Sequence, residues 1–201
     1  MLESDDELND LRKGAENGNA ESQYLLAVSC HMGETGVKDI KVAIKWYTRA
    51  AEQGHLQAQY NLAMIYFVGD DVTQDFNKTA KWLQRGAEPG EAASQNALAV
   101  LYFNGQGVGK NLEKAIKWWQ RAAANGNSSA QVSIGAMHYD GKGVEKNIVK
   151  ALMWQYVSIK NGSDDGSKNR STLEKEATPE QIDEAKKLAD EWGRKYRKNS
   201  H

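Results

Sequence analysis

The chain has 201 residues and a formal net charge of −1, with 40 % hydrophobic and 26 % charged residues. This composition is typical of a soluble folded protein and excludes a disordered chain. The near-zero charge gives no general basic field for nucleic acid, and no apolar stretch is long enough to cross a membrane.

The first ten residues carry five acids and no base. They lack the basic and apolar regions of a signal peptide, which predicts a cytoplasmic protein. A chain whose leader had been removed would look the same, so a secreted or periplasmic location is the alternative. We interpret residues 1–18 as an N-terminal capping helix, because Ala15 and Gly18 start periodic columns and the polar Asp10 suits an exposed end.

A repeat of 36 residues follows. The columns that show it best are Gly18, Gly54, Gly90, Gly126 and Gly162, and Trp46, Trp82, Trp118 and Trp154. Several independent columns do not share one spacing by chance. The sequence therefore predicts four units over residues 19–162, with the bounds 19–54, 55–90, 91–126 and 127–162.

Each unit reads as two helices. In the second unit the apolar period predicts helices over about 56–68 and 77–88, separated by a break at Gly69. A column of small residues would let the two helices approach closely, and the tryptophan column is expected in the core. The small residues are Ala27, Ala63, Ala99 and Gly135.

The third unit carries the fullest pattern. It contains Ala97-Leu98-Ala99-Val100-Leu101-Tyr102, Gly105-Gln106-Gly107-Val108, Lys114-Ala115-Ile116-Lys117-Trp118 and Ala122-Ala123-Ala124-Asn125-Gly126. This pattern resembles the Sel-1-like repeat family, relatives of the tetratricopeptide repeats, over about residues 10–162. The resemblance implies an all-α, right-handed α–α superhelix, or solenoid, with a concave groove for partners. Repeat two departs from it, with Asp70-Asp71-Val72 in place of Gly-x-Gly-Val.

The end of the chain divides into two segments. Residues 163–178 are polar without an apolar period, and we expect a mobile loop there. Thr178 and Pro179 then mark a helix start, and we expect a capping helix over 179–198 that covers the last repeat. The apolar stripe of that helix is Ile182, Ala185, Ala189 and Trp192. Caps at both ends predict a single domain and a monomer.

In a solenoid of helix pairs the first helix of each unit lines the concave face. Carrying the tetratricopeptide pattern over by position gives a surface of aromatic, aliphatic and amide groups, which suits protein partners. The predicted partner-binding residues are Tyr24, His31, Tyr60, Met64, Phe67, Asn96, Phe103, Asn104, Tyr139 and Asp140. Aliphatic neighbours on this face include Val28, Met32 and Val68. The alternative is that the aromatic side chains only pack between neighbouring repeats.

No residue pattern predicts catalysis. The four histidines lack a zinc-site spacing, and the single cysteine, Cys30, lies in an apolar helical run. The glycine-rich stretch 105–109 lacks the Gly-Lys-Ser/Thr of a phosphate loop. We therefore expect a non-catalytic adaptor or scaffold that binds a protein or peptide, with no cofactor, no metal, no nucleic acid and no membrane insertion.

The family resemblance leaves two alternatives. Some bacterial members neutralise toxins, so an immunity protein against a cognate bacterial toxin is one. Some cysteine-rich members have been linked to hydrolysis of β-lactam-type compounds, which makes a hydrolase the other. Those members carry a pair of cysteines per repeat, whereas this chain has one cysteine in total.

Overall fold

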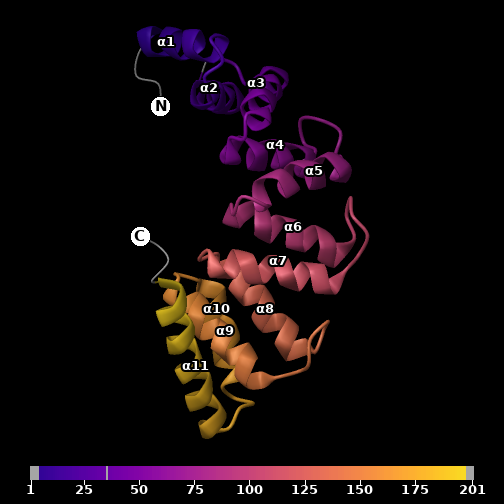
Figure 1. Ribbon diagram of the computed structural model, residues 1–201, viewed down its shortest axis with the longest axis vertical. Helices are drawn as coiled ribbons and strands as arrows, with labels where there is room; N and C mark the ends of the chain where they lie inside the picture. The colour runs from indigo at the N-terminus through magenta and orange to yellow at the C-terminus, as the bar shows by residue number, and fades with distance from the viewer. Residues whose placement is uncertain (1–4, 35, 198–201) are drawn as a thin grey trace. The chain divides into compact units, whose positions relative to one another are not determined.

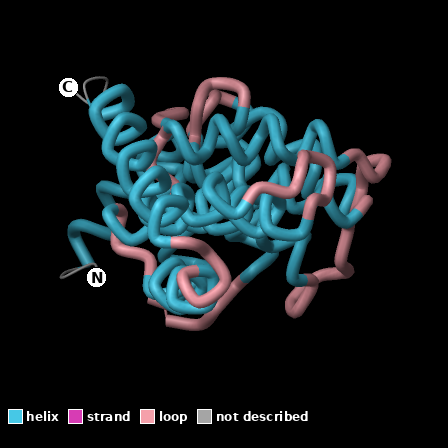
Figure 2. Tube along the Cα trace, turned by 90° about the horizontal axis from the view of Figure 1, so that it is seen from below, coloured by secondary structure: helices cyan, strands magenta, loops and turns pink. Residues whose placement is uncertain are grey.

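The structure is a computed structural model that describes residues 5–34 and 36–197. Within these residues the chain forms eleven α-helices and no strand (Figures 1 and 2). The helices are α1 (Asp5–Glu16), α2 (Ala20–Met32), α3 (Ile40–Glu52), α4 (Leu56–Val68), α5 (Phe76–Ala87), α6 (Ala92–Asn104), α7 (Leu112–Ala124), α8 (Ser128–Asp140), α9 (Ile148–Lys160), α10 (Asp164–Leu173) and α11 (Pro179–Arg197). Helices α2 to α9 form four packed pairs, which confirms the predicted all-α fold of paired repeats.

The 36-residue period specifies where each helix starts and stops. The first helix of every pair begins after a side chain that accepts a backbone N–H, and it ends at a glycine with positive φ. The capping residues are Asn19, His55, Glu91 and Asn127, and the glycines are Gly33, Gly69, Gly105 and Gly141. The second helices are capped in the same way by Asp39, Asp75, Asn111 and Asn147.

The chain divides into two compact units. Unit 1 comprises Met1–Pro89 with Gln106–Val108 and contains α1–α5. Unit 2 comprises Gly90–Gly105 with Gly109–His201 and contains α6–α11.

The tryptophan column forms core in three of its four positions. Trp46, Trp82 and Trp154 are buried, whereas Trp118 is half-buried and its neighbour Trp119 takes the buried place. Trp118 packs against the edge of the unit 2 core, so the prediction holds for it only in part. A second buried column lies one residue later in each second helix, at Tyr47, Leu83, Trp119 and Gln155.

Buried glutamines at the starts of α2, α4 and α8 bond to the end of the helix before each of them, and sequence analysis missed them. Each glutamine donates its Nε2 to a backbone carbonyl eight residues earlier, at 3.0 Å for Gln23 to Ala15, 2.9 Å for Gln59 to Ala51 and 3.0 Å for Gln131 to Ala123. These bonds add a side-chain donor to carbonyls in the last turns of the preceding helices, each of which also accepts the N–H of the glycine three residues later.

A second amide extends this ladder, 30 residues after each glutamine. Gln53 donates its Nε2 to Gln23 Oε1 at 2.7 Å, and Asn161 donates its Nδ2 to Gln131 Oε1 at 3.0 Å. The corresponding position for Gln59 is Pro89, which has no side-chain donor. Gln59 Oε1 is buried and has no hydrogen-bond partner among the described residues. The ladder is thus broken in unit 1.

The prediction of a mobile loop over 163–178 is wrong for most of its length, because Asp164–Leu173 form α10. Ser163 caps this helix by accepting the N–H of Gly166 at 3.2 Å, and Gly166 and Leu173 are buried. Helix α10 packs against α9 with only these two buried residues, which are too few to give the sequence an apolar period.

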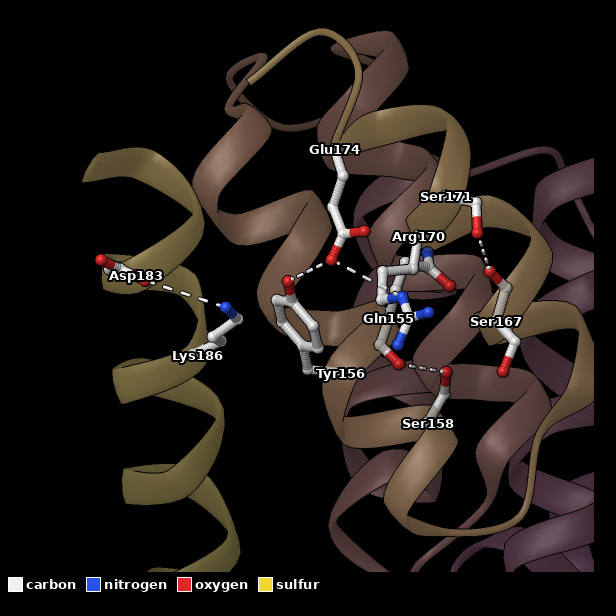
Figure 3. A network of polar contacts seen from close by, with 9 residues as sticks. All are labelled: Gln155, Tyr156, Ser158, Ser167, Arg170, Ser171, Glu174, Asp183 and Lys186. Atoms are coloured by element: carbon white, nitrogen blue, oxygen red, sulfur yellow. Dashed lines mark hydrogen bonds and ion pairs between the residues drawn. The ribbon is translucent and has the colours of Figure 1, made fainter. Parts of the chain in front are cut away.

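Polar contacts hold the end of α10 in place (Figure 3). The hydroxyl of Tyr156 on α9 donates to the carboxylate of Glu174 at 2.6 Å, and Arg170 Nε lies 3.6 Å from the same carboxylate. Burial, followed by the bond to Glu174, raises the pKa of Tyr156, so this hydroxyl stays protonated at neutral pH.

Helix α11 lies beside α9 (Figure 1). Its start is a capping box, in which the Thr178 N–H donates to Gln181 Oε1 at 2.9 Å and the Gln181 N–H donates to Thr178 Oγ1 at 3.3 Å. Ala185 and Ala189 are fully buried, and the Trp192 ring lies 4.6 Å from that of Trp154. The helix therefore buries an apolar face of the fourth repeat.

Candidate partner-binding site

A groove with a volume of about 410 Å³ lies in unit 1 between α2, α3 and α4. Predicted concave-face residues of the first two repeats line it, namely Tyr24, Val28, His31 and Met32 of α2 and Met64 and Val68 of α4. Side chains spaced by three, four or seven residues share one face of a helix, which is why these positions meet. Three of the ten predicted binding residues, Tyr24, His31 and Met64, are thus brought together.

Two apolar side chains at the edge of the groove are exposed. Met32 is 70 % exposed and Val68 is 53 % exposed, and each is the last residue of its helix. The glycines that follow them, Gly33 and Gly69, turn the chain away. Apolar surface that gathers beside a groove marks an interaction site more often than single scattered side chains do.

An aromatic wall closes one side of the groove. Tyr47 of α3 is buried, and its hydroxyl accepts the Nδ2 of Asn61 at 3.4 Å. Burial raises the pKa of Tyr47 to about 12, so the phenol is neutral at physiological pH. The Tyr24 ring stacks on His55 at 4.4 Å, and His55 Nε2 lies 3.0 Å from the carboxylate of Glu21. These contacts hold the rings of Tyr24 and Tyr47 in place without a bound partner.

His31 offers a free imidazole to the groove. Its ring is edge-on to Tyr47, with the ring centres 6.1 Å apart, and no described residue forms a hydrogen bond with it. Burial, and then the charge of Lys38, lowers the pKa of His31, while Asp71 opposes the shift. The ring is therefore neutral near pH 7 and can both donate and accept a hydrogen bond.

Two loops place charged groups at the mouth of the groove. Lys38 Nζ pairs with Asp71 Oδ2 at 2.5 Å, and the exposed Asp70 lies beside them. In the third and fourth repeats the position of Asp71 is taken by Gly107 and Gly143, with φ of +66° and +72°. No described residue other than glycine has a positive φ, so the loop of repeat two follows another path.

The remaining predicted residue pair of repeat two lies outside this groove. The Phe67 ring packs edge-on to Phe76, with the ring centres 5.8 Å apart. Tyr60 is half-buried on α4 and does not line the groove. The Phe67 contact lies within repeat two, so it is not the packing between neighbouring repeats that was the alternative for this residue.

Several predicted residues of unit 2 are engaged in contacts within that unit. Phe103 packs against Trp119 at 5.6 Å, and the Tyr139 hydroxyl donates to both carboxylate oxygens of Glu176 at 2.9 and 3.1 Å. Asp140, which is exposed, accepts a bond from Lys142 at 2.7 Å. Asn104 is exposed, and Asn96 is half-buried with its Oδ1 unpaired among the described residues.

Sequence analysis missed the groove residues that come from α3 and the loops. Tyr47 belongs to the buried column next to the tryptophans, and its period of 36 residues was the available signal. Lys38 and Asp71 are 33 residues apart, and only the fold brings these two loop residues together. The Asp70-Asp71 departure from the repeat pattern was visible, but its position at a groove was not.

A second hollow, of about 560 Å³, lies in unit 2 beside α11. Trp192 and Tyr196 line it together with the side chains of Asn125 and Asn161. Both amides already donate within unit 2, Asn125 to Gly90 O at 3.0 Å and Asn161 to Gln131. Because these groups serve the ladder, the groove of unit 1 is the better candidate.

The described residues offer no metal centre, since no three His, Cys, Asp or Glu side chains gather in them. The helices in that part of the chain are all too short or too polar to span a membrane. Cys30 is buried, as expected.

The family model described as Sel1 repeat matches residues 20–55, 56–90, 92–127 and 128–155. A solved structure of a protective antigen from uropathogenic Escherichia coli, with an SLR fold, shares 37 % identity and a TM-score of 0.86. The alignment covers 94 % of this chain but 41 % of the antigen, so the chain spans less than half of that relative. No curated protein matches the chain.

Two further solved structures are similar. A Sel1 repeat protein from Oxalobacter formigenes shares 26 % identity with a TM-score of 0.78, over 97 % of this chain and 79 % of that one. An immunity protein from Pseudomonas aeruginosa shares 20 % identity with a TM-score of 0.54, over 92 % of this chain and 73 % of that one. The similarity to the immunity protein shows only that the two chains share a fold.

Proposed function

Because the chain belongs to the Sel1 repeat family, whose repeats are generally protein-interaction modules, we propose that it is a non-catalytic adaptor that binds a segment of another protein in the groove of unit 1. The observation that carries this proposal is the pair of exposed apolar side chains, Met32 and Val68, at the edge of that groove.

The shape and chemistry of the groove support a protein segment as the occupant. Its volume of about 410 Å³ falls within the range of about 300–1,000 Å³ that is typical of binding pockets. Val28 and Met64 give it an apolar lining, and methionine adapts its shape to different partners. His31 and Asp70 add polar groups that can fix the direction of a bound backbone or side chain.

The two other functions raised by the sequence find less support. Cys30 is buried in the core of unit 1, which is a poor environment for a thiolate nucleophile. The immunity protein from Pseudomonas aeruginosa shares the fold alone, at 20 % identity, and no feature of the groove favours toxin inhibition over other protein binding.

The test uses peptides selected from a random 12-residue phage library on the full chain. Met32→Gln combined with Val68→Gln removes the exposed apolar contacts without adding charge. We expect this variant to bind the selected peptides at least tenfold more weakly, while its thermal unfolding changes little, because both side chains are exposed.

The matched control is Leu25→Gln, which changes another exposed apolar residue of α2 that does not line the groove. It should leave peptide binding unchanged. Equal binding by the double variant and the wild type would exclude the groove as the site.

A further inference from the structure

We infer that the segment held in this groove carries a bulky apolar side chain close in sequence to a lysine or arginine. The inference rests on the proposed function and adds the chemistry of the partner. It follows from the division of the groove into an apolar part and an acidic part that adjoin each other.

The apolar part is lined by residues of α2 and α4 and by the first residue of α3. Val28 of α2 and Met64 and Ile65 of α4 line it, and Met32 and Val68 stand at its edge. A partner side chain the size of leucine, methionine or phenylalanine would remove this surface from water. Burying such a side chain at an interface is favourable in proportion to the apolar area covered.

The acidic part of the groove is formed by residues of the loops that follow α2 and α4. The charged residues that line the groove are one base, Lys38, and two acids, Asp70 and Asp71, which sum to −1 while His31 is neutral. Lys38 already pairs with Asp71, so the uncompensated carboxylate is that of Asp70. Asp70 is exposed and has no ion-pair partner among the described residues. A lysine or arginine of the partner would supply a charge-assisted hydrogen bond to it.

The acidic pair is specific to this repeat. In the third repeat, a Cβ built at Gly107 would lie 2.0 Å from the backbone oxygen of Phe76, so that position admits no side chain. Gly143 of the fourth repeat is also close-packed, with its Cβ position 2.9 Å from Leu112 Cβ. The loop of repeat two can therefore carry a carboxylate at a place where the third and fourth repeats cannot.

The two parts adjoin, which limits the spacing in the partner. Val68 and Asp70 are separated only by Gly69, at the end of α4. The apolar and the basic side chain of the bound segment must therefore lie within a few residues of each other. In an extended segment, residues two apart point to the same side and suit this arrangement.

The experiment uses the random 12-residue phage library on the full chain, with a second screen on the Met32→Gln, Val68→Gln variant. We expect the peptides lost in the second screen to carry lysine or arginine within three residues of leucine, methionine or phenylalanine. A synthetic copy of the best peptide should bind Asp70→Asn at least fivefold more weakly. It should bind Lys38→Gln more tightly, because that change releases the Asp71 carboxylate.

The control is Glu52→Gln, which neutralises an exposed carboxylate of α3 outside the groove and should not change binding. Groove-dependent peptides that are neutral or acidic, or an Asp70→Asn variant with wild-type affinity, would overturn this inference and leave the proposed function standing. If the second screen loses no peptides, the proposed function and this inference both fail.

Discussion

The two units use the same helix pair but present different side chains at equivalent positions. In unit 1 the first helices carry Tyr24 and Met64 into an open groove. In unit 2 the equivalents are Asn96 and Ala136, and the aromatic Tyr139 is bonded to Glu176, in the turn that joins α10 to α11. The comparison teaches that the repeat fixes where a side chain lies, whereas residue identity and the end segments decide which positions can receive a partner.

The amide ladder also differs between the units. In unit 2, Gln131 is bonded at both ends, to Ala123 O and by Asn161. In unit 1, Pro89 leaves Gln59 Oε1 unpaired. A buried acceptor without a donor costs about 1–3 kcal/mol, so the second repeat has a local weakness that the fourth repeat lacks.

The largest expected effect tests the core beneath α11. Trp154→Ala should lower the free energy of unfolding by about 3–5 kcal/mol, because Trp154 is buried and supports Trp192. Urea denaturation followed by circular dichroism measures it. Trp118→Ala, in the same sequence column but half-buried, should cost clearly less. Equal losses would contradict the account of the core.

The next effect compares the ladder in the two units. Gln131→Leu should destabilise by about 1–3 kcal/mol, because it removes the side-chain bond to Ala123 O and leaves the Asn161 amide without its acceptor. Gln59→Leu should cost less, since it also removes an acceptor that is already unpaired. A larger loss for Gln59→Leu in urea denaturation would be evidence against the broken ladder.

Repairing the ladder should stabilise unit 1. Pro89→Asn supplies a donor for Gln59 Oε1, which should raise the free energy of unfolding by about 1–3 kcal/mol. Removing the proline should lower it by about 0.4–1 kcal/mol. We therefore expect a net gain in stability of about 1 kcal/mol. Pro89→Ala is the control, because it removes the proline without adding a donor. The two variants should differ in melting temperature, with Pro89→Asn the higher.

The smallest effect is on pH dependence. Burial is the main cause that lowers the pKa of His31 and of His138, so the unfolded chain binds more protons than the folded chain just below pH 6.5. Stability should therefore rise with pH towards about 6.5 and be lost as pH falls below it. Near His31 the charges are Lys38 and Asp71, and near His138 the charge is Lys150.

The carboxylates with lowered pKa, Asp75 and Glu180, lose their contribution as the pH falls below about 4.5, outside this window. Replacing both histidines by glutamine should flatten the stability profile between pH 5 and pH 7. A slope that is unchanged in this variant would assign the effect to other groups.

Much of the fold could be predicted because the period carries both the start and the stop of each helix. The bounds of α4 agree with the predicted 56–68, since His55 caps one end and Gly69 the other. The partial exposure of Trp118, in a column whose other three tryptophans are buried, has no local signal in the sequence. Helix α10 was missed because its stability comes from Ser163 and two buried residues.

The candidate site could be predicted only in part. The helix period places Tyr24 and His31 on one face of α2, and both line the groove together with Met64 of α4. The loop contact between Lys38 and Asp71 depends on how two repeats stack, and the bond from Tyr139 to Glu176 depends on where the end segment folds back. Neither contact has a local signal in the sequence.

The most direct test of the central claim uses the methionine methyl groups as probes. Met32 and Met64 line the groove of unit 1, whereas Met137 and Met153 lie in the core of unit 2. In a protein labelled with ¹³C at these methyls, adding a selected peptide should shift the nuclear magnetic resonance signals of Met32 and Met64 and leave the other two unchanged. Shifts confined to Met137 and Met153 would contradict the account.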